Sequence, residues 1–233
     1  MVSALKTAPN RDVLHPFDLK YGTDTGGYLG PEELVKGRAN DALNHGYSAI
    51  APSVFHEACG RWRKTLPAVS GRIEAYSFVD VGAGKGRALL LAAELPFRKV
   101  VGVELSEELA SIARGNVARW SRVARINARR IRVVQGDAAK FRWPRTPLLV
   151  YLYNPFACSL IAQMAEGLAI VAASGSGLVD LLYVNPTCTD TLTGQGLFVR
   201  LWTARIPMDE TDQKADPYGT NSDLVSGYRL KPH

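Results

Sequence analysis

Three glycines set close together are the residues of this sequence with the clearest chemical use. In "FVDVGAGKGR", Gly82, Gly84 and Gly86 follow a short apolar run that contains Asp80. Glycine permits tight turns and lets a ligand approach the backbone closely, so such a cluster between a strand and a helix predicts a loop that holds a small molecule. The competing interpretation is a plain structural turn.

The spacing of the glycines discriminates between two classes of ligand. Dinucleotides and other nucleosides both use a glycine loop with an acid at the end of the next strand, here Glu104. The dinucleotide pattern is GxGxxG, whereas this loop is GxGxG and has Arg87 at the third glycine position. Asp80 would repel a pyrophosphate but suits a ligand with an ammonium group. S-adenosylmethionine carries an ammonium and a sulfonium and has no phosphate.

The loop lies in a pattern of short apolar runs that alternate with amphipathic stretches. This pattern is typical of a parallel sheet with crossover helices and predicts an α/β, Rossmann-like doubly wound fold. Helices are expected between the first two strands, after Ser106 and over 158–172, while 196–207 and 224–230 look like an antiparallel C-terminal strand pair joined by a polar loop. The predicted parallel strands are 77–82, 99–105, 131–137, 148–155 and 177–184.

The first 76 residues lack this alternation. The stretch "HPFDLKYGTDTGGYLGPEEL" is rich in Gly, Asp and Thr and predicts an ordered loop, and 51–66 predicts a helix opened by Pro52. No linker separates this part, so we expect residues 1–76 to form a helical and loop cap with a lid segment on a core of residues 77–233.

Four motifs in order carry a resemblance to a known family. "FVDVGAGKGR", "VGVELS", "VVQGDAAKF" and "YLYNPF" resemble the motif series of class I S-adenosylmethionine-dependent methyltransferases over residues 77 to about 156. The resemblance implies S-adenosyl-L-methionine as cofactor and S-adenosyl-L-homocysteine as product. It implies these cofactor-binding residues: Asp80, Gly82, Ala83, Gly84 and Gly86 near the methionine part, Glu104 and Leu105 at the ribose, and Asp137 and Ala138 at the adenine.

Alternatives stay open for the two carboxylates. Glu104 could be a surface acid at a strand end, and Asp137 could be a turn or cap residue. If Glu104 meets a ribose, it should have no partner in the core, and its loss should leave the fold intact.

The end of the fourth strand suggests the methyl acceptor. Asn154, Pro155 and Phe156 resemble the (Asp/Asn)-Pro-Pro-(Tyr/Phe) motif of amino-group methyltransferases, with one proline in place of two. The resemblance implies transfer to a nitrogen of a protein side chain or small amine, with Asn154 and the Pro155 carbonyl accepting hydrogen bonds and Phe156 stacking. The alternatives are O-methylation of a small metabolite and a non-catalytic scaffold that binds the cofactor or RNA.

The N-terminal segment carries two looser resemblances. "YSAIAPSVFHEA", with Tyr47, Pro52 and Ser53, is similar to the segment before the glycine loop in Dot1-like and archaeal lysine methyltransferases. "FDLKYGTDTGGY" resembles a block that precedes the core in uncharacterised bacterial proteins of this class. Its place suggests a lid in which Tyr21 and Thr25 reach the cofactor and Asp24 helps to take the acceptor proton. A glycine-rich surface turn is the alternative.

Composition limits the remaining functions. The net charge is +6, with many arginines between 114 and 145, so RNA or an acidic partner is conceivable, but a solvated helix face is favoured because nucleic-acid signatures are missing. Three cysteines without CxxC spacing suggest buried apolar side chains rather than disulfides or a metal site, and the four histidines form no catalytic pattern. With no membrane-length apolar run and no leader, a cytoplasmic protein is expected.

Overall fold

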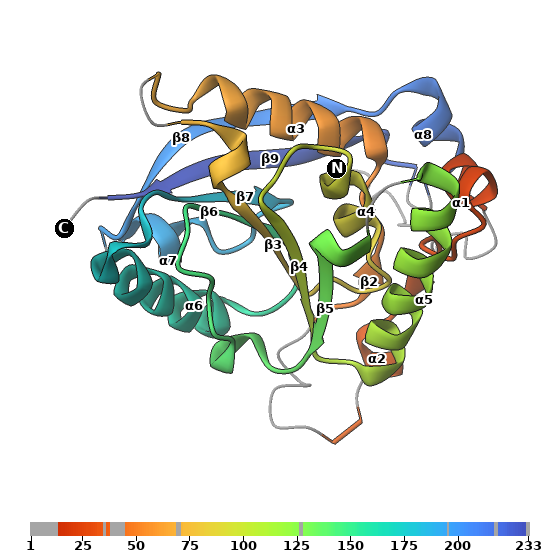
Figure 1. Cartoon of the computed structure of the whole chain (residues 1–233), viewed down its shortest axis with the longest axis horizontal. Coiled ribbons are helices and arrows are strands. Elements are labelled where there is room, and N and C mark those ends of the chain that lie inside the picture. Colours follow the sequence, from red (N-terminus) through yellow and green to blue (C-terminus); the bar gives the residue numbers. More distant parts are fainter. Residues whose placement is uncertain are drawn as a thin grey trace, which may run out of the picture.

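A seven-stranded sheet forms the centre of the molecule (Figure 1). The computed structural model describes residues 14–34, 36–37, 45–68, 71–125, 128–194, 196–216 and 219–231. The strands are β3 (Ser77–Val81), β4 (Lys99–Glu104), β5 (Ile131–Gln135), β6 (Leu148–Tyr153), β7 (Val179–Val184), β8 (Phe198–Pro207) and β9 (Ser222–Leu230). Their order in the sheet is β5-β4-β3-β6-β7-β9-β8.

The strand directions confirm the predicted sheet. Strands β3 to β7 pair in parallel, and β9 inserts antiparallel between β7 and β8. The chain builds outward from β3 to β5 and then returns to add β6 on the other side of β3. This reversal opens a crevice at the carboxyl ends of the strands, where open α/β sheets bind ligands.

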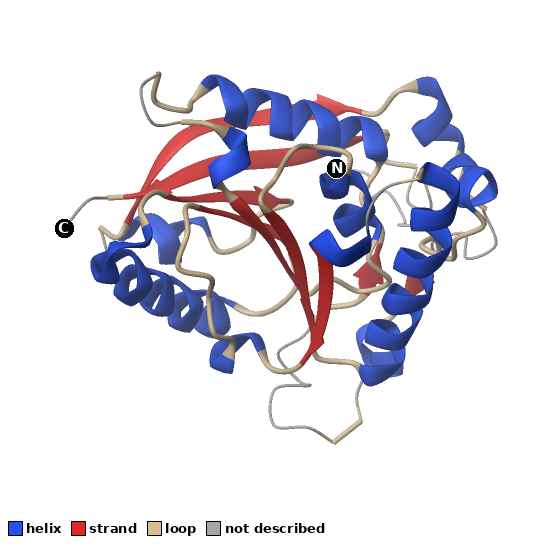
Figure 2. Ribbon diagram, viewed as in Figure 1, coloured by secondary structure: helices blue, strands red, loops and turns tan. Residues whose placement is uncertain are grey.

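Helices cover both faces of the sheet (Figures 1 and 2). Side chains alternate along β3, so that Phe78 faces one apolar cluster and Val79 the other. The first cluster contains side chains of α3 (Pro52–Lys64), α4 (Arg87–Ala93) and α5 (Glu107–Ala124), and the second contains those of α6 (Cys158–Val171) and α7 (Thr189–Gly194). Short helical turns lie at η2 (Ile73–Ala75), η3 (Ala128–Arg130), η4 (Ala138–Lys140) and, as a π-helical end to α6, η5 (Ala172–Ser176).

The N-terminal segment is more regular than the predicted loop. It contains α1 (Pro16–Tyr21), α2 (Pro31–Leu34) and an antiparallel pair of β1 (Tyr28–Leu29) with β2 (Tyr47–Ser48). His15 caps α1, since its Nδ1 accepts the Phe17 N–H at 3.0 Å. The predicted polar loop near the C-terminus likewise holds α8 (Glu210–Lys214), capped by Asp209. These helices are too short to show an apolar period, so they were missed.

Two of the three cysteine predictions are wrong. Cys59 is buried and free as expected, but Cys158, at the start of α6, forms a disulfide with Cys188, which follows β7. The two are 30 residues apart in sequence, and only the parallel neighbours β6 and β7 bring them together. Among the described residues, no helix is both long enough and apolar enough to cross a membrane.

Candidate functional site

A pocket opens at the carboxyl ends of β3, β4, β5 and β6. Its space, counted out to the open mouth, is about 860 Å³. Its wall is formed by the glycine loop, the end of β4 with the start of α5, the turn after β5, the turn after β6, α6, Leu34 and the residues around β2. Predicted cofactor residues in this wall are Gly82, Gly84, Glu104, Leu105, Asp137 and Ala138.

The glycine loop needs glycine for two reasons. Gly82, Gly84 and Gly86 all have positive φ, at 76°, 55° and 89°. A Cβ on Gly82 would lie 2.6 Å from Cβ of Pro155, and one on Gly84 would lie 2.2 Å from the Tyr47 ring. The first two glycines line the pocket, whereas Gly86 precedes α4 as its N-cap.

Glu104 has structural partners that the sequence did not reveal. Its side chain is buried, with Oε2 accepting the Gly84 N–H and Oε1 accepting the Ser106 N–H, both at 2.8 Å. The expectation of no core partner is therefore wrong. This carboxylate fixes the glycine loop and the start of α5 relative to β4.

Asp137 combines two predicted roles. Its Oδ1 accepts the Ala139 N–H at 2.9 Å and caps η4, and the residue also lines the pocket. A cap residue and a ligand-facing residue are thus compatible at this position.

Asp80 is a buried carboxylate without a cation. It is 3% exposed, and no described Lys, Arg or His forms an ion pair with it. Burial, with a smaller contribution from the charge of Glu104, raises the pKa of Asp80 to about 8. Asp80 and Ala83 line a smaller cavity that shares Gly82 and Tyr47 with the main pocket.

The turn after β6 lies against the glycine loop. Pro155 and Phe156 line the pocket. Asn154 has left-handed backbone at φ 41°, and its Oδ1 accepts hydrogen bonds from Thr187 Oγ1 at 2.9 Å and from the Tyr183 hydroxyl at 3.4 Å. Asn154 itself is not in the pocket lining.

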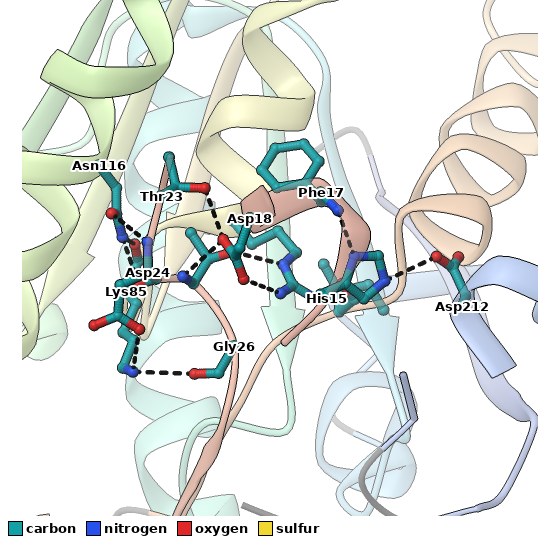
Figure 3. Close-up of polar contacts among 12 residues, drawn as sticks. His15, Phe17, Asp18, Thr23, Asp24, Gly26, Lys85, Asn116 and Asp212 are labelled. Atoms are coloured by element: carbon teal, nitrogen blue, oxygen red, sulfur yellow. Dashed lines mark hydrogen bonds and ion pairs between the residues drawn. The ribbon is translucent and has the colours of Figure 1, made fainter. Parts of the chain in front are cut away.

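The predicted lid residues Tyr21, Asp24 and Thr25 lie outside the pocket lining, and Figure 3 shows Asp24 among the polar contacts of the N-terminal segment. Thr25 is fully buried and bonds Asp18, and Arg87 donates to both residues. Asp24 pairs with Lys85 at 2.8 Å. Tyr21 packs against Phe17 and Trp120.

His45 and Tyr47 are two of the pocket residues that the sequence did not assign to the site. The Tyr47 ring covers Gly84, and its hydroxyl donates to the Thr25 carbonyl at 2.7 Å. His45 donates its backbone N–H to the Pro155 carbonyl at 3.0 Å. Tyr47 lies in a segment that carries a loose family resemblance. No motif around His45 in the sequence indicates a place in the site.

Part of the arginine-rich face lines a groove at the outer edge of the sheet. Its basic side chains include Lys99, Arg132, Lys140 and Arg142, around an apolar floor that contains Val101. The groove shares Gly136 and Asp137 with the main pocket. On an edge strand, exposed charges also serve to prevent pairing with other chains, so the groove alone does not identify a partner.

Comparisons with known proteins agree with this geometry. Residues 78–169 match a family model described as a methyltransferase domain. No curated protein sequence matches the chain. Neither the family model nor the structures support the predicted link to Dot1-like and archaeal lysine methyltransferases.

Solved structures share the fold at low identity. TrmN from Thermus thermophilus has 16% identity and a TM-score of 0.51, with 78% of this chain and 49% of that one covered. An RNA methyltransferase from Salinibacter ruber, in complex with S-adenosyl-L-homocysteine, has 13% identity and a TM-score of 0.50, with 80% and 95% covered. The [4+2]-cyclase SpnF has 12% identity and a TM-score of 0.50, with 78% and 81% covered. These likenesses show the fold alone.

Proposed function

We propose that this chain, which carries a class I S-adenosylmethionine-dependent methyltransferase domain, transfers the methyl group to a nitrogen of a protein side chain or small amine. A cytoplasmic location stays a prediction. The Cys158–Cys188 disulfide is more typical of proteins in oxidising compartments.

The pocket residues fit the cofactor. Asp80 is a buried carboxylate with no cation among the described residues, which suits the ammonium group of the methionine part. Glu104 places a carboxylate in the pocket lining, the kind of group that would accept hydrogen bonds from ribose hydroxyls. Asp137 and Ala138 would border the adenine. When bound, S-adenosylmethionine supplies a methyl group already activated on a sulfonium.

The observation that carries the acceptor proposal is the contact between the glycine loop and the turn after β6. Pro155 approaches Gly82 so closely that a Cβ there would clash. A nucleophile held by Asn154, Pro155 and Phe156 would therefore meet the methionine end of the cofactor. Alignment of this kind contributes roughly 7–11 kcal/mol to such reactions.

The side chain of Asn154 is held in one orientation. Thr187 and Tyr183 both donate to its Oδ1, so an N–H of the acceptor would take the place of the longer bond from Tyr183. The carbonyl oxygen of Pro155 accepts the His45 backbone N–H with one lone pair and has a second lone pair for an N–H of the acceptor. Phe156 would pack against the carrier of the nitrogen. Asp24 is paired with Lys85 outside the pocket, so its predicted proton-accepting role is not part of this proposal.

The test is release of S-adenosyl-L-homocysteine with separate pools of peptides, small amines, hydroxylated metabolites and RNA, followed by mass spectrometry of the product. We expect N-methylation in the peptide or amine pool. Asn154→Ala should abolish turnover while calorimetric affinity for S-adenosylmethionine stays unchanged, and Ser159→Ala, at an exposed position on α6, serves as the matched control.

Each other result contradicts a stated part of the proposal. Methylation of hydroxyl groups would favour the O-methyltransferase alternative, and methylation of RNA would replace the proposed protein or amine acceptor with a nucleic acid. Cofactor binding without transfer in any pool would favour the scaffold. Full activity of Asn154→Ala would remove the role given to that residue.

A further inference from the structure

The ring of His45 is oriented by a hydrogen bond that fixes where its proton lies. Its Nδ1 is 2.9 Å from the Asn154 carbonyl oxygen. Because a carbonyl oxygen can only accept, Nδ1 must carry the proton in this contact. The neutral imidazole then has its lone pair on Nε2. The residue is half-buried and lines the main pocket.

A second histidine shows the opposite arrangement (Figure 3). Nδ1 of His15 accepts the Phe17 N–H, so its proton lies on Nε2, which contacts Asp212 Oδ1 at 3.0 Å. Both ring nitrogens of His15 are used inside the fold. Nε2 of His45, in contrast, forms no hydrogen bond with any residue that the structure describes.

The other candidate proton acceptors of the pocket already have partners. Both oxygens of Glu104 hold backbone amides, and Asp137 caps η4. The Tyr47 hydroxyl donates to Thr25, and burial raises its pKa. Tyr153, also in the lining, has a partner of its own.

We propose that His45 is the general base that removes the proton from the amine acceptor. This inference rests on the proposed nitrogen acceptor and adds a residue to its chemistry. The acceptor ammonium gives a proton to Nε2 of His45. The freed electron pair on nitrogen forms the bond to the methyl carbon as the carbon–sulfur bond breaks, with its electron pair left on sulfur. His45 then releases the proton to water. General-base catalysis of this kind contributes about 10²–10⁴-fold to a rate.

The first experiment needs no acceptor. Long-range ¹H–¹⁵N NMR of the full-length protein at neutral pH reports which imidazole nitrogen carries the proton. We expect the Nδ1–H tautomer for His45 and the Nε2–H tautomer for His15. An Nε2–H tautomer at His45 would overturn the proposal.

The second experiment uses His45→Asn, in which the side-chain amide nitrogen replaces Nδ1 and keeps the bond to Asn154 while the base is removed. We expect kcat to fall about 100-fold or more, with unchanged cofactor affinity, and the rise of kcat with pH on the acid side to disappear. The other titratable groups that line this pocket are Tyr47, Glu104, Asp137 and Tyr153, with Asp80 in the adjoining cavity. His56→Asn, on the exposed surface of α3, is the matched control and should behave as wild type.

The two proposals fail in different ways. If amines are methylated and His45→Asn keeps the wild-type kcat and pH profile, the base role is wrong and the nitrogen acceptor stands. If no amine is methylated by the wild-type protein, the nitrogen acceptor fails and the base role fails with it, whatever the tautomer.

Discussion

Asp18 and Asp80 are buried to the same extent, each 3% exposed. They belong to two regions of the molecule that differ in how the buried carboxylate is paired. Asp18 belongs to the contact between the N-terminal segment and α4, where Arg87 Nη2 lies 2.9 Å from its Oδ2 (Figure 3). Asp80 lies beneath the glycine loop and has no cation among the described residues.

The difference separates a charge used by the fold from one available to a ligand. Oδ1 of Asp18 also accepts from Thr23 and from both donors of Thr25, so its bonding capacity is spent within the chain. No cation of the described residues pairs with Asp80, and burial, with a smaller contribution from the charge of Glu104, raises its pKa. A buried carboxylate that the fold leaves without a cation is the better candidate for a cationic ligand.

The largest expected effect comes from breaking the closed network. Arg87→Met leaves Asp18 buried without its cation, which typically costs about 3–5 kcal/mol. Urea unfolding measures the loss. Asp18→Asn combined with Arg87→Met should recover part of it, because no unpaired charge remains. Ordinary surface substitutions change the free energy of unfolding by no more than about 0.5 kcal/mol. A change within that range for Arg87→Met alone would contradict the role of Arg87 as the cation of Asp18.

A smaller effect is expected from Glu104, which belongs to both fold and site. Glu104→Ala leaves the buried N–H groups of Gly84 and Ser106 without an acceptor, which costs about 1–3 kcal/mol, and it should also weaken cofactor binding. Thermal unfolding and calorimetric titration measure the two losses. Glu108→Ala, an exposed position in the first turn of α5, is the control. Weakened binding with unchanged stability would mean that the two amide bonds contribute nothing.

Asp80 is expected to give a stability that depends on pH rather than a fixed loss. The carboxyl titrates near 3.9 in an unfolded chain and at about 8 in the folded one. Its contribution to stability is thus complete below about pH 4 and is lost as the pH rises to about 8. Asp80→Asn should remove this slope from the stability of the cofactor-free protein.

The same variant tests the ligand. Pairing with an ammonium favours the ionised carboxyl, so cofactor binding should release a proton, and affinity should rise with pH towards about 8. Asp80→Asn should bind about tenfold or more weakly and release no proton at this site, as measured by calorimetry in buffers of different ionisation enthalpy. Equal affinity of both proteins would place the ammonium elsewhere.

Much of the core followed from the sequence because its signals are local. The apolar runs of β3, β4 and β6 and the glycines after β3 define strand, turn and helix within a few residues. The short helix α1 was missed because it depends on the cap from His15, whose ring is held by Asp212 at the other end of the chain.

Alternating apolar runs and the GxGxG loop determined the fold and the class of cofactor, because backbone propensity and glycine conformation act over short distances. Tertiary structure alone decided that Asp18 pairs with Arg87 while Asp80 has no cation among the described residues, that Cys158 pairs with Cys188, and that the His45 ring bonds the Asn154 carbonyl. Each of these contacts joins segments that are far apart in the chain. Such contacts depend on distances in the folded protein, which a single sequence does not give.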